Sequence, residues 1–126
     1  ITSCTGFIYS TALSPVVVAA MFKAWELLPT LQAERTRLMQ TASDLRQRLQ
    51  AMGLDTGAST THIVPVILGD EQRTLKARDK LQQRGINVSA VRPPTVPPHT
   101  ARLRMALASH HTPQQIDALV DALAGV

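Results

Sequence analysis

The sequence predicts an α+β fold, in which a small antiparallel or mixed sheet of about three strands is covered on one face by helices. A helical pattern runs from Val16 to Met52. Segments 63–68, 86–91 and 101–107 are β-branched or alternate between apolar and polar residues, as strands do. Helix-start signals precede two further apolar stretches. The predicted order is therefore long helix, strand, helix, strand, strand, helix.

The long helix has a predicted start, interruption and end. Ser14 suits the N-cap and Pro15 the first helical position. Pro29 lacks a backbone donor and clashes with the preceding turn, so we expect a kink or break there. Gly53 is placed to end the helix in a left-handed cap. After the proline, the predicted apolar stripe comprises Leu31, Leu38, Leu45, Leu49 and Met52.

Local signals also define the later elements. Pro65 donates no ladder hydrogen bond, so its strand is predicted to be an edge strand or to contain a bulge. Asp70 can cap a helix that runs to about Arg84. Thr112 and Gln115 are spaced for a capping box at the start of the last helix. These signals place one helix between the first and second predicted strands and another after the last strand.

Length and composition bound the class of protein. The chain has 126 residues, which fits one domain, and 44% hydrophobic residues, which suffice for a core. The net charge is +4 and the pI is about 10.0. The basic residues are spread along the chain and all aromatic residues fall in its first quarter, so we expect no nucleic-acid partner.

The single cysteine, Cys4, cannot form an internal disulfide, so we expect a reducing, cytoplasmic location and an inert thiol. We expect no signal peptide, no bilayer-spanning stretch and no membrane partner. We expect no metal site, because His110-His111 lacks a carboxylate at ligand spacing. The chain starts without Met, and we expect a piece of a larger enzyme: an arm over 1–14 continuing from a large domain, and a small domain over 15–126.

The segment RPPTVPPHTARLR, residues 92–104, carries the most chemical information. A rigid proline-rich loop runs into a strand that is predicted to place Leu103 and Met105 toward the core and Arg102 and Arg104 on the opposite face. An arginine binds a carboxylate through two parallel charge-assisted hydrogen bonds. The pattern is compatible with a small-carboxylate site, and also with an ordinary solvated strand face.

The stretch RPPTVPPHTARLRMALASHHT resembles the carboxy-terminal signature of the α-oxoamine synthases, which are pyridoxal 5'-phosphate (PLP) enzymes of the aspartate aminotransferase fold type. FIYSTALSP, HIVPVILGD and GINVSAVRPPTVP resemble the same family in the same order, so the resemblance covers nearly the whole chain. It implies a small carboxy-terminal domain of a homodimeric acyltransferase. The leading RPPTVP is most similar to the members that condense L-alanine with a pimeloyl thioester.

The resemblance also implies roles for individual residues. Arg104 matches the arginine that binds the carboxylate of the substrate amino acid, and Arg92 and Thr95 match the substrate loop near the mouth of the site. Ser10 and Thr11 match the position that reaches the cofactor phosphate of the neighbouring subunit. His111 would be structural.

Two differences from the family pattern affect what is expected of the chain. His99 stands where the family usually has glycine, which puts the backbone of the proline loop in doubt. Lys23, Lys76 and Lys80 all lie in helical patterns and none matches the family's cofactor lysine, so we expect no catalytic residue and no bound cofactor in this chain alone. A missing amino-terminal large domain would be its partner.

Three alternatives stay open. In the first, the parent belongs to another branch, such as a 2-amino-3-ketobutyrate ligase or a 5-aminolevulinate synthase. In the second, the chain is a non-catalytic folding or dimerisation unit. The basic charge also leaves a nucleic-acid-binding module as a third reading, which a steep dependence of DNA affinity on salt would favour.

Overall fold

The computed structural model describes residues 12–126. Contacts within the chain divide it after Ala33, so the described part has one unit over 12–33 and a second over Glu34–Val126. This division differs from the boundary at residue 14 expected between arm and domain. The domain assignment stays a prediction.

The first unit contains α2 (Pro15–Leu27) and the short 3-10 helix η1 (Leu28–Leu31). Ser14 and Pro15 take the predicted N-cap and first helical positions, although the Ser14 side chain makes no cap hydrogen bond. The predicted interruption at Pro29 is confirmed, because the α-helix gives way to η1 there. Removing one backbone donor is enough to change the local hydrogen-bond pattern.

The surface of α2 is apolar and exposed. None of its residues is buried, and Val16, Phe22 and Trp25 are 77%, 69% and 73% exposed. A helix that is apolar all round is normally buried in a protein core or a membrane. The expectation that no stretch could span a bilayer is wrong by length and composition. The helical run Pro15–Ala51 has an 18-residue window of mean hydropathy 1.2. This criterion is weak, because helices from soluble cores also meet it.

The second unit is built on a three-stranded sheet of β1 (Ile63–Gly69), β2 (Ser89–Val91) and β3 (Ala101–Ala106). The strand order is β1-β3-β2, and both pairs are antiparallel. The predicted α+β class and the small sheet are confirmed. Pro65 lies in an edge strand, as predicted. β2 is shorter than the predicted 86–91, because Ile86 and Val88 pack partly buried against the core before the strand begins.

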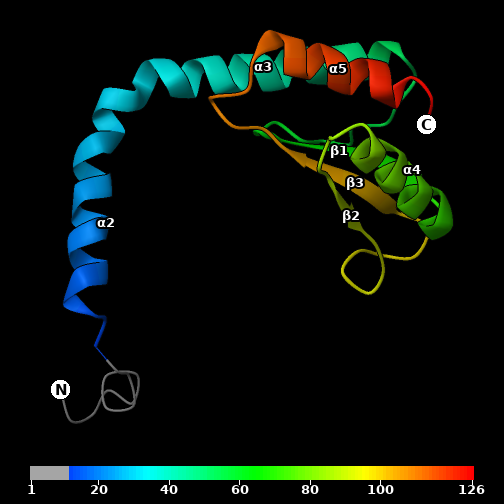
Figure 1. The fold of residues 1–126 in the computed structure, drawn as a ribbon. Coiled ribbons are helices and arrows are strands. Elements are labelled where there is room, and N and C mark those ends of the chain that lie inside the picture. Colours follow the sequence, from blue (N-terminus) through cyan, green and yellow to red (C-terminus); the bar gives the residue numbers. More distant parts are fainter. Residues whose placement is uncertain (1–11) are drawn as a thin grey trace. The chain divides into compact units, whose positions relative to one another are not determined.

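Helices cover one face of this sheet. They are α3 (Gln32–Ala51), α4 (Glu71–Gln83) and α5 (Pro113–Leu123). Figure 1 shows α5 running along α3, with α4 beside the strands. An ion pair of 2.8 Å between Arg48 and Asp117 joins α3 to α5. Large apolar side chains from every layer are fully buried: Leu45, Leu49, Val64, Val66, Leu81, Leu103 and Leu123.

The predicted helix boundaries of this unit are confirmed by their caps. The Asp70 carboxylate accepts a 2.7 Å hydrogen bond from the backbone N–H of Arg73 at the start of α4. Thr112 and Gln115 form a reciprocal capping box at the start of α5. Gly53 and Gly85 end α3 and α4 with positive φ angles of 79° and 76°. The caps fix where the chain turns back toward the sheet.

Candidate functional site

The side chain of Arg104 lies on the sheet face that the helices leave open. Along β3 the burial alternates, with Leu103 and Met105 buried on the helix side and Arg104 exposed on the other. Successive side chains of a strand point to opposite faces of the sheet, so burial of one face in the core leaves the alternate residues on the other face. The inward-outward assignment from the sequence is confirmed, while the carboxylate-binding role stays a prediction.

The sheet register pairs Arg104 with neutral residues on both neighbouring strands. Arg104 is paired with Pro65 of β1 on one side and with Ser89 of β2 on the other. Directly paired residues of antiparallel strands project from the same face. No carboxylate therefore stands beside Arg104 among its direct cross-strand neighbours, so its charge is available to an anion from outside the sheet. Sequence reasoning missed Pro65 and Ser89 as neighbours, because register depends on contacts between distant segments.

The two arginines of the strand are not equivalent. The Arg102 Nε donates a 2.9 Å hydrogen bond to the Thr100 carbonyl, which ties this side chain back to the incoming loop. Within residues 12–126, no side-chain hydrogen bond or ion pair involves Arg104. A guanidinium on a half-open face can bind a carboxylate in a bidentate geometry. Arg104 is therefore the better candidate anchor.

Arg92 and Thr95 share one tight turn after β2. The Thr95 backbone N–H donates a 3.0 Å hydrogen bond to the Arg92 carbonyl, and both side chains are exposed. Val91 at the end of β2 is paired with Arg102, whereas Arg104 is paired with Ser89 at the other end. The turn therefore begins three residue rows, roughly 10 Å, along the sheet from Arg104. The structure places the three predicted substrate residues in one region, and their substrate contacts stay predictions.

His99 adopts the left-handed backbone conformation that glycine takes without strain. Its φ angle is 62°, and among the described residues it is the one non-glycine residue with positive φ. The loop is also tightly packed there, because a Cβ atom on Gly69 would lie 3.3 Å from the His99 carbonyl oxygen. His99 therefore holds this left-handed backbone at the strain cost of a side chain.

We expect His99→Gly to stabilise the chain by about 0.5–1 kcal/mol, because the left-handed strain then disappears and exceeds the entropy that glycine adds to the unfolded state. Chemical denaturation of the whole chain measures the change. His99→Ala keeps a Cβ at the strained position and serves as the control. An equal gain in both variants would show that the imidazole, and not the backbone, causes the cost.

The cofactor assignments can be checked only in part. Ser10 and Thr11 lie outside the described residues. Lys23 is 71% exposed on α2 and forms a 3.1 Å ion pair with Glu26. Lys76 and Lys80 are exposed on α4, a helix of the covered face. Neither Lys76 nor Lys80 therefore lies on the open sheet face that carries Arg104.

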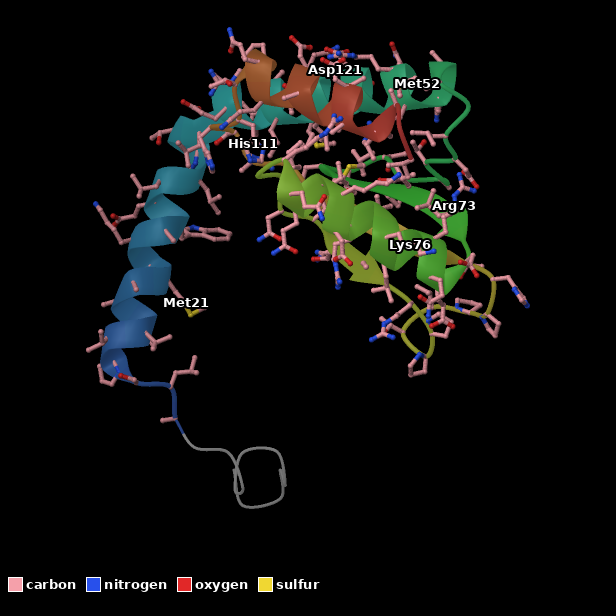
Figure 2. The ribbon with its side chains drawn as sticks, turned by 45° about the vertical axis from the view of Figure 1, so that its right-hand side comes forward. Met21, Met52, Arg73, Lys76, His111 and Asp121 are labelled. Carbon is pink, nitrogen blue, oxygen red and sulfur yellow. The ribbon has the colours of Figure 1, made fainter. Side chains whose placement is uncertain are left out.

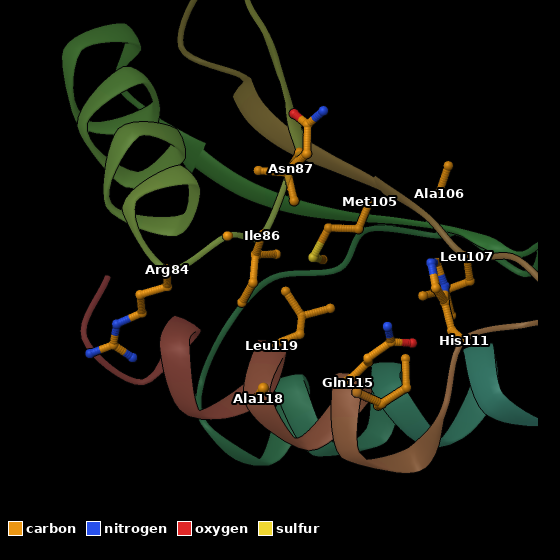
Figure 3. Close-up of a pocket in the computed structure, with 13 residues that line it drawn as sticks. Arg84, Ile86, Asn87, Met105, Ala106, Leu107, His111, Gln115, Ala118 and Leu119 are labelled. Atoms are coloured by element: carbon orange, nitrogen blue, oxygen red, sulfur yellow. The ribbon is translucent and has the colours of Figure 1, made fainter.

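One cavity of the second unit lies away from Arg104. This cavity of about 410 Å³ lies between the segment after α4, the end of β3 and α5. In Figure 3, Ile86, Met105 and Leu119 face one another across it, with Arg84 and His111 at its two ends. Arg104 is not among the residues that line this cavity.

His111 has a structural contact. Its Nδ1 accepts a 3.1 Å hydrogen bond from the Ala108 backbone N–H, which closes the turn before α5. The adjacent ring of His110 lies 5.0 Å away between centroids, so the two rings do not point to opposite sides as an extended segment would require. Among residues 12–126, no group of three metal-ligating side chains is present.

Comparison with known proteins identifies the family. Residues 3–123 match the profile of the aminotransferase class I and II family. The chain belongs to this family. A protein of Paramagnetospirillum magneticum described as a putative 8-amino-7-oxononanoate synthase is 49% identical over 98% of the chain. The 8-amino-7-oxononanoate synthase of Gluconacetobacter diazotrophicus is 45% identical over the same share. The chain spans 31% of the length of each of these two relatives.

Solved structures of the family share the fold. A serine palmitoyltransferase from S. paucimobilis, with a bound PLP–myriocin aldimine, matches 97% of the chain and 31% of its own with a TM-score of 0.85 and 31% identity. An 8-amino-7-oxononanoate synthase from Francisella tularensis matches 95% of the chain and 35% of its own with a TM-score of 0.80 and 27% identity. The α+β unit is thus a recurrent portion of larger family members.

Proposed function

We propose that this chain is the carboxy-terminal small domain of a cytoplasmic, homodimeric 8-amino-7-oxononanoate synthase. The parent enzyme joins L-alanine to a pimeloyl thioester with loss of carbon dioxide, in biotin synthesis. The observation that carries the proposal is Arg104, a guanidinium without a partner among the described residues, on the open face of a domain whose relatives bear that name.

The chain's own contribution is to bind and orient the amino acid. Arg104 holds the alanine carboxylate by paired charge-assisted hydrogen bonds, and the neutral neighbours Pro65 and Ser89 leave its charge unopposed. Holding one end of alanine aligns its Cα–H bond for removal of the proton. The cofactor PLP, when bound, supplies the electron sink that stabilises the resulting carbanion.

The proline loop sets the edge of this site. Its turn at Arg92–Thr95 and the hydrogen bond from Arg102 to Thr100 hold the chain close to the start of β3. Arg92 and Thr95 face the acyl donor or the amino acid from there. The lysine that holds the cofactor belongs, in this proposal, to the part of the relatives' length that the chain does not match.

The exposed apolar helix α2 supports the same proposal. Side chains such as Phe22 and Trp25 are far more exposed than is usual for large apolar residues of a finished domain. In the proposed parent, the remaining polypeptide of the homodimer buries this surface. The fold therefore belongs to a larger assembly, in which Ser10 and Thr11 approach the cofactor phosphate.

The test is the substrate preference of the full-length enzyme. With a pimeloyl thioester as donor, kcat/KM for L-alanine should exceed that for glycine by about tenfold or more, because one methyl group in an apolar pocket contributes roughly 1–3 kcal/mol. Release of carbon dioxide with each turnover measures the reaction. A preference for glycine or L-serine would assign the parent to another branch of the α-oxoamine synthases.

A further inference from the structure

Ser89 shares a cross-strand row with Arg104. It is the first residue of β2, and it is paired with Arg104 in the antiparallel register of β2 and β3. Directly paired residues project from the same face of the sheet, with their Cβ atoms roughly 4.5–5.5 Å apart. On the other side of the row, the Pro65 side chain has neither a donor nor an acceptor. The Ser89 hydroxyl is therefore the one polar side-chain group in this row besides the guanidinium.

The fold uses neither of these two polar groups. Within residues 12–126, no side-chain hydrogen bond or ion pair involves Ser89 or Arg104. A serine hydroxyl can accept as well as donate, and an arginine donates from Nε and from both terminal Nη groups. The hydroxyl oxygen is bonded directly to the Cβ of Ser89, and the longer arginine side chain can bend across the row to bring Nε to it. The pairing thus places an acceptor within reach of the Arg104 Nε.

Arg102 shows how an arginine of β3 is held at its Nε. Its own row partners, Ile67 and Val91, are both apolar. The acceptor comes instead from the loop backbone, because the Arg102 Nε donates to the Thr100 carbonyl at 2.9 Å. Arg104 lies two residues farther along β3 from that loop, and its row supplies a hydroxyl where the row of Arg102 has none.

Other polar side chains of the domain are less well placed to hold Arg104. Asn87 precedes Ser89 by two residues, which puts it on a diagonal to Arg104, and diagonal neighbours in a sheet lie roughly 7–8 Å apart. Figure 3 shows the Asn87 side chain projecting away from Leu119 and the cavity. Figure 2 shows Arg73 and Lys76 on α4, in the helix layer that covers the other face of the sheet. Ser89 is therefore the better candidate to orient the guanidinium.

From these observations, we propose that Ser89 is a positioning residue for the substrate carboxylate and that it acts through Arg104. Its hydroxyl accepts a hydrogen bond from the Arg104 Nε, which leaves both Nη groups for the paired hydrogen bonds to the carboxylate. A long side chain loses rotamer freedom when it binds, and one that is already held loses less. The inference rests on the proposed function, because Arg104 must first be the anchor of the amino acid.

Two variants of the full-length enzyme isolate the hydroxyl. Ser89→Val removes it and Ser89→Thr keeps it, and both put a β-branched side chain of similar shape into the strand. Ser89→Val should raise the KM for L-alanine about five- to tenfold, because a hydrogen bond to a charged group is lost. Its kcat should change less than about twofold, because the bound geometry is re-formed once alanine is in place. Ser89→Thr should keep the KM within about twofold of the unmodified enzyme.

Two further variants test the route through Arg104. Arg104→Lys replaces Nε by a methylene group, so in that background Ser89→Val should raise the KM for L-alanine less than about twofold. Asn87→Ala removes the diagonal polar side chain and should change this KM less than about twofold. In a crystal structure with L-alanine bound, the Ser89 Oγ should lie about 2.7–3.2 Å from the Arg104 Nε.

The outcomes separate this inference from the proposed function. If Arg104→Ala leaves the dependence on L-alanine unchanged, the proposed site and the role of Ser89 fall together. If Arg104→Ala weakens catalysis as expected but Ser89→Val and Ser89→Thr have equal KM values, only the role of Ser89 is lost. An undiminished effect of Ser89→Val in the Arg104→Lys background, or the same rise in KM from Asn87→Ala, would likewise overturn the inference and leave the proposed function standing.

Discussion

Replacing Arg104 by alanine in the full-length enzyme is expected to lower kcat/KM for L-alanine by about 30- to 1,000-fold, which corresponds to roughly 2–4 kcal/mol of transition-state stabilisation. The reason is that the alanine carboxylate loses its charge-assisted partner and its fixed orientation at once. Steady-state kinetics with varied L-alanine and a saturating acyl donor measure the effect. The KM for the acyl donor should change much less.

Arg35→Ala provides the matched control for this variant. Arg35 is an exposed arginine of α3 with no side-chain hydrogen bond or ion pair among the described residues, so its removal deletes the same charge without touching the open sheet face. Arg104→Lys should recover only part of the lost activity, because an ammonium group cannot form the bidentate pair. An unchanged dependence on alanine in Arg104→Ala would remove the proposed role of this residue.

Replacing Leu103 by alanine is expected to lower the free energy of unfolding by about 3 kcal/mol, within the range of 2–5 that buried leucines show. Leu103 is fully buried in the central strand, between the two arginines in sequence, and packs against the helices that cover the sheet. Its truncation leaves a cavity in the layer that supports the open face. Denaturant unfolding of the chain, followed by circular dichroism, measures the loss.

Met52→Ala is the control for the core variant. Met52 is 38% exposed, so its truncation should cost less than about 1 kcal/mol even though a similar number of apolar atoms is removed. Similar losses in both variants would mean that β3 is not the centre of a packed core. If Leu103→Ala lowers the free energy of unfolding as expected but leaves substrate binding in the full-length enzyme unchanged, the open face tolerates movement of the layer beneath it.

Local chemistry allowed much of the fold to be predicted from the sequence. The capping box of Thr112 and Gln115 involves residues three apart, and the side chain of Asp70 reaches only the next helical turn. The exposure of Arg104 could be predicted from β3 alone. Its neighbours Leu103 and Met105 are apolar and buried, so the side chain between them faces the other way. Predictions of this kind succeed because each depends on a few neighbouring positions.

Non-local pairing could not be predicted in the same way. The strand order β1-β3-β2 and the register that places Pro65 and Ser89 beside Arg104 depend on contacts between segments far apart in the sequence. Residues 86–88 alternate between apolar and polar as a strand does, yet β2 forms only where β3 offers partners. In the predicted stripe of the long helix, Leu45 and Leu49 are buried while Leu31 is 42% exposed.

The remaining differences arise where the sequence alone lacks the decisive information. A left-handed conformation at His99 has only a weak local signal, since histidine adopts it less readily than glycine, and the resemblance to a family with glycine there draws attention to it. The apolar residues of α2 indicate burial, but none of them is buried in this chain. In the proposed parent enzyme, further polypeptide covers these residues.

The arrangement around Arg104 can be measured directly in a crystal structure of the full-length enzyme with L-alanine bound. We expect two guanidinium nitrogens of Arg104 to lie about 2.7–2.9 Å from the two carboxylate oxygens of alanine, as in a bidentate pair. If another residue binds that carboxylate while Arg104 extends into solvent, the open sheet face of this domain is not the amino-acid site.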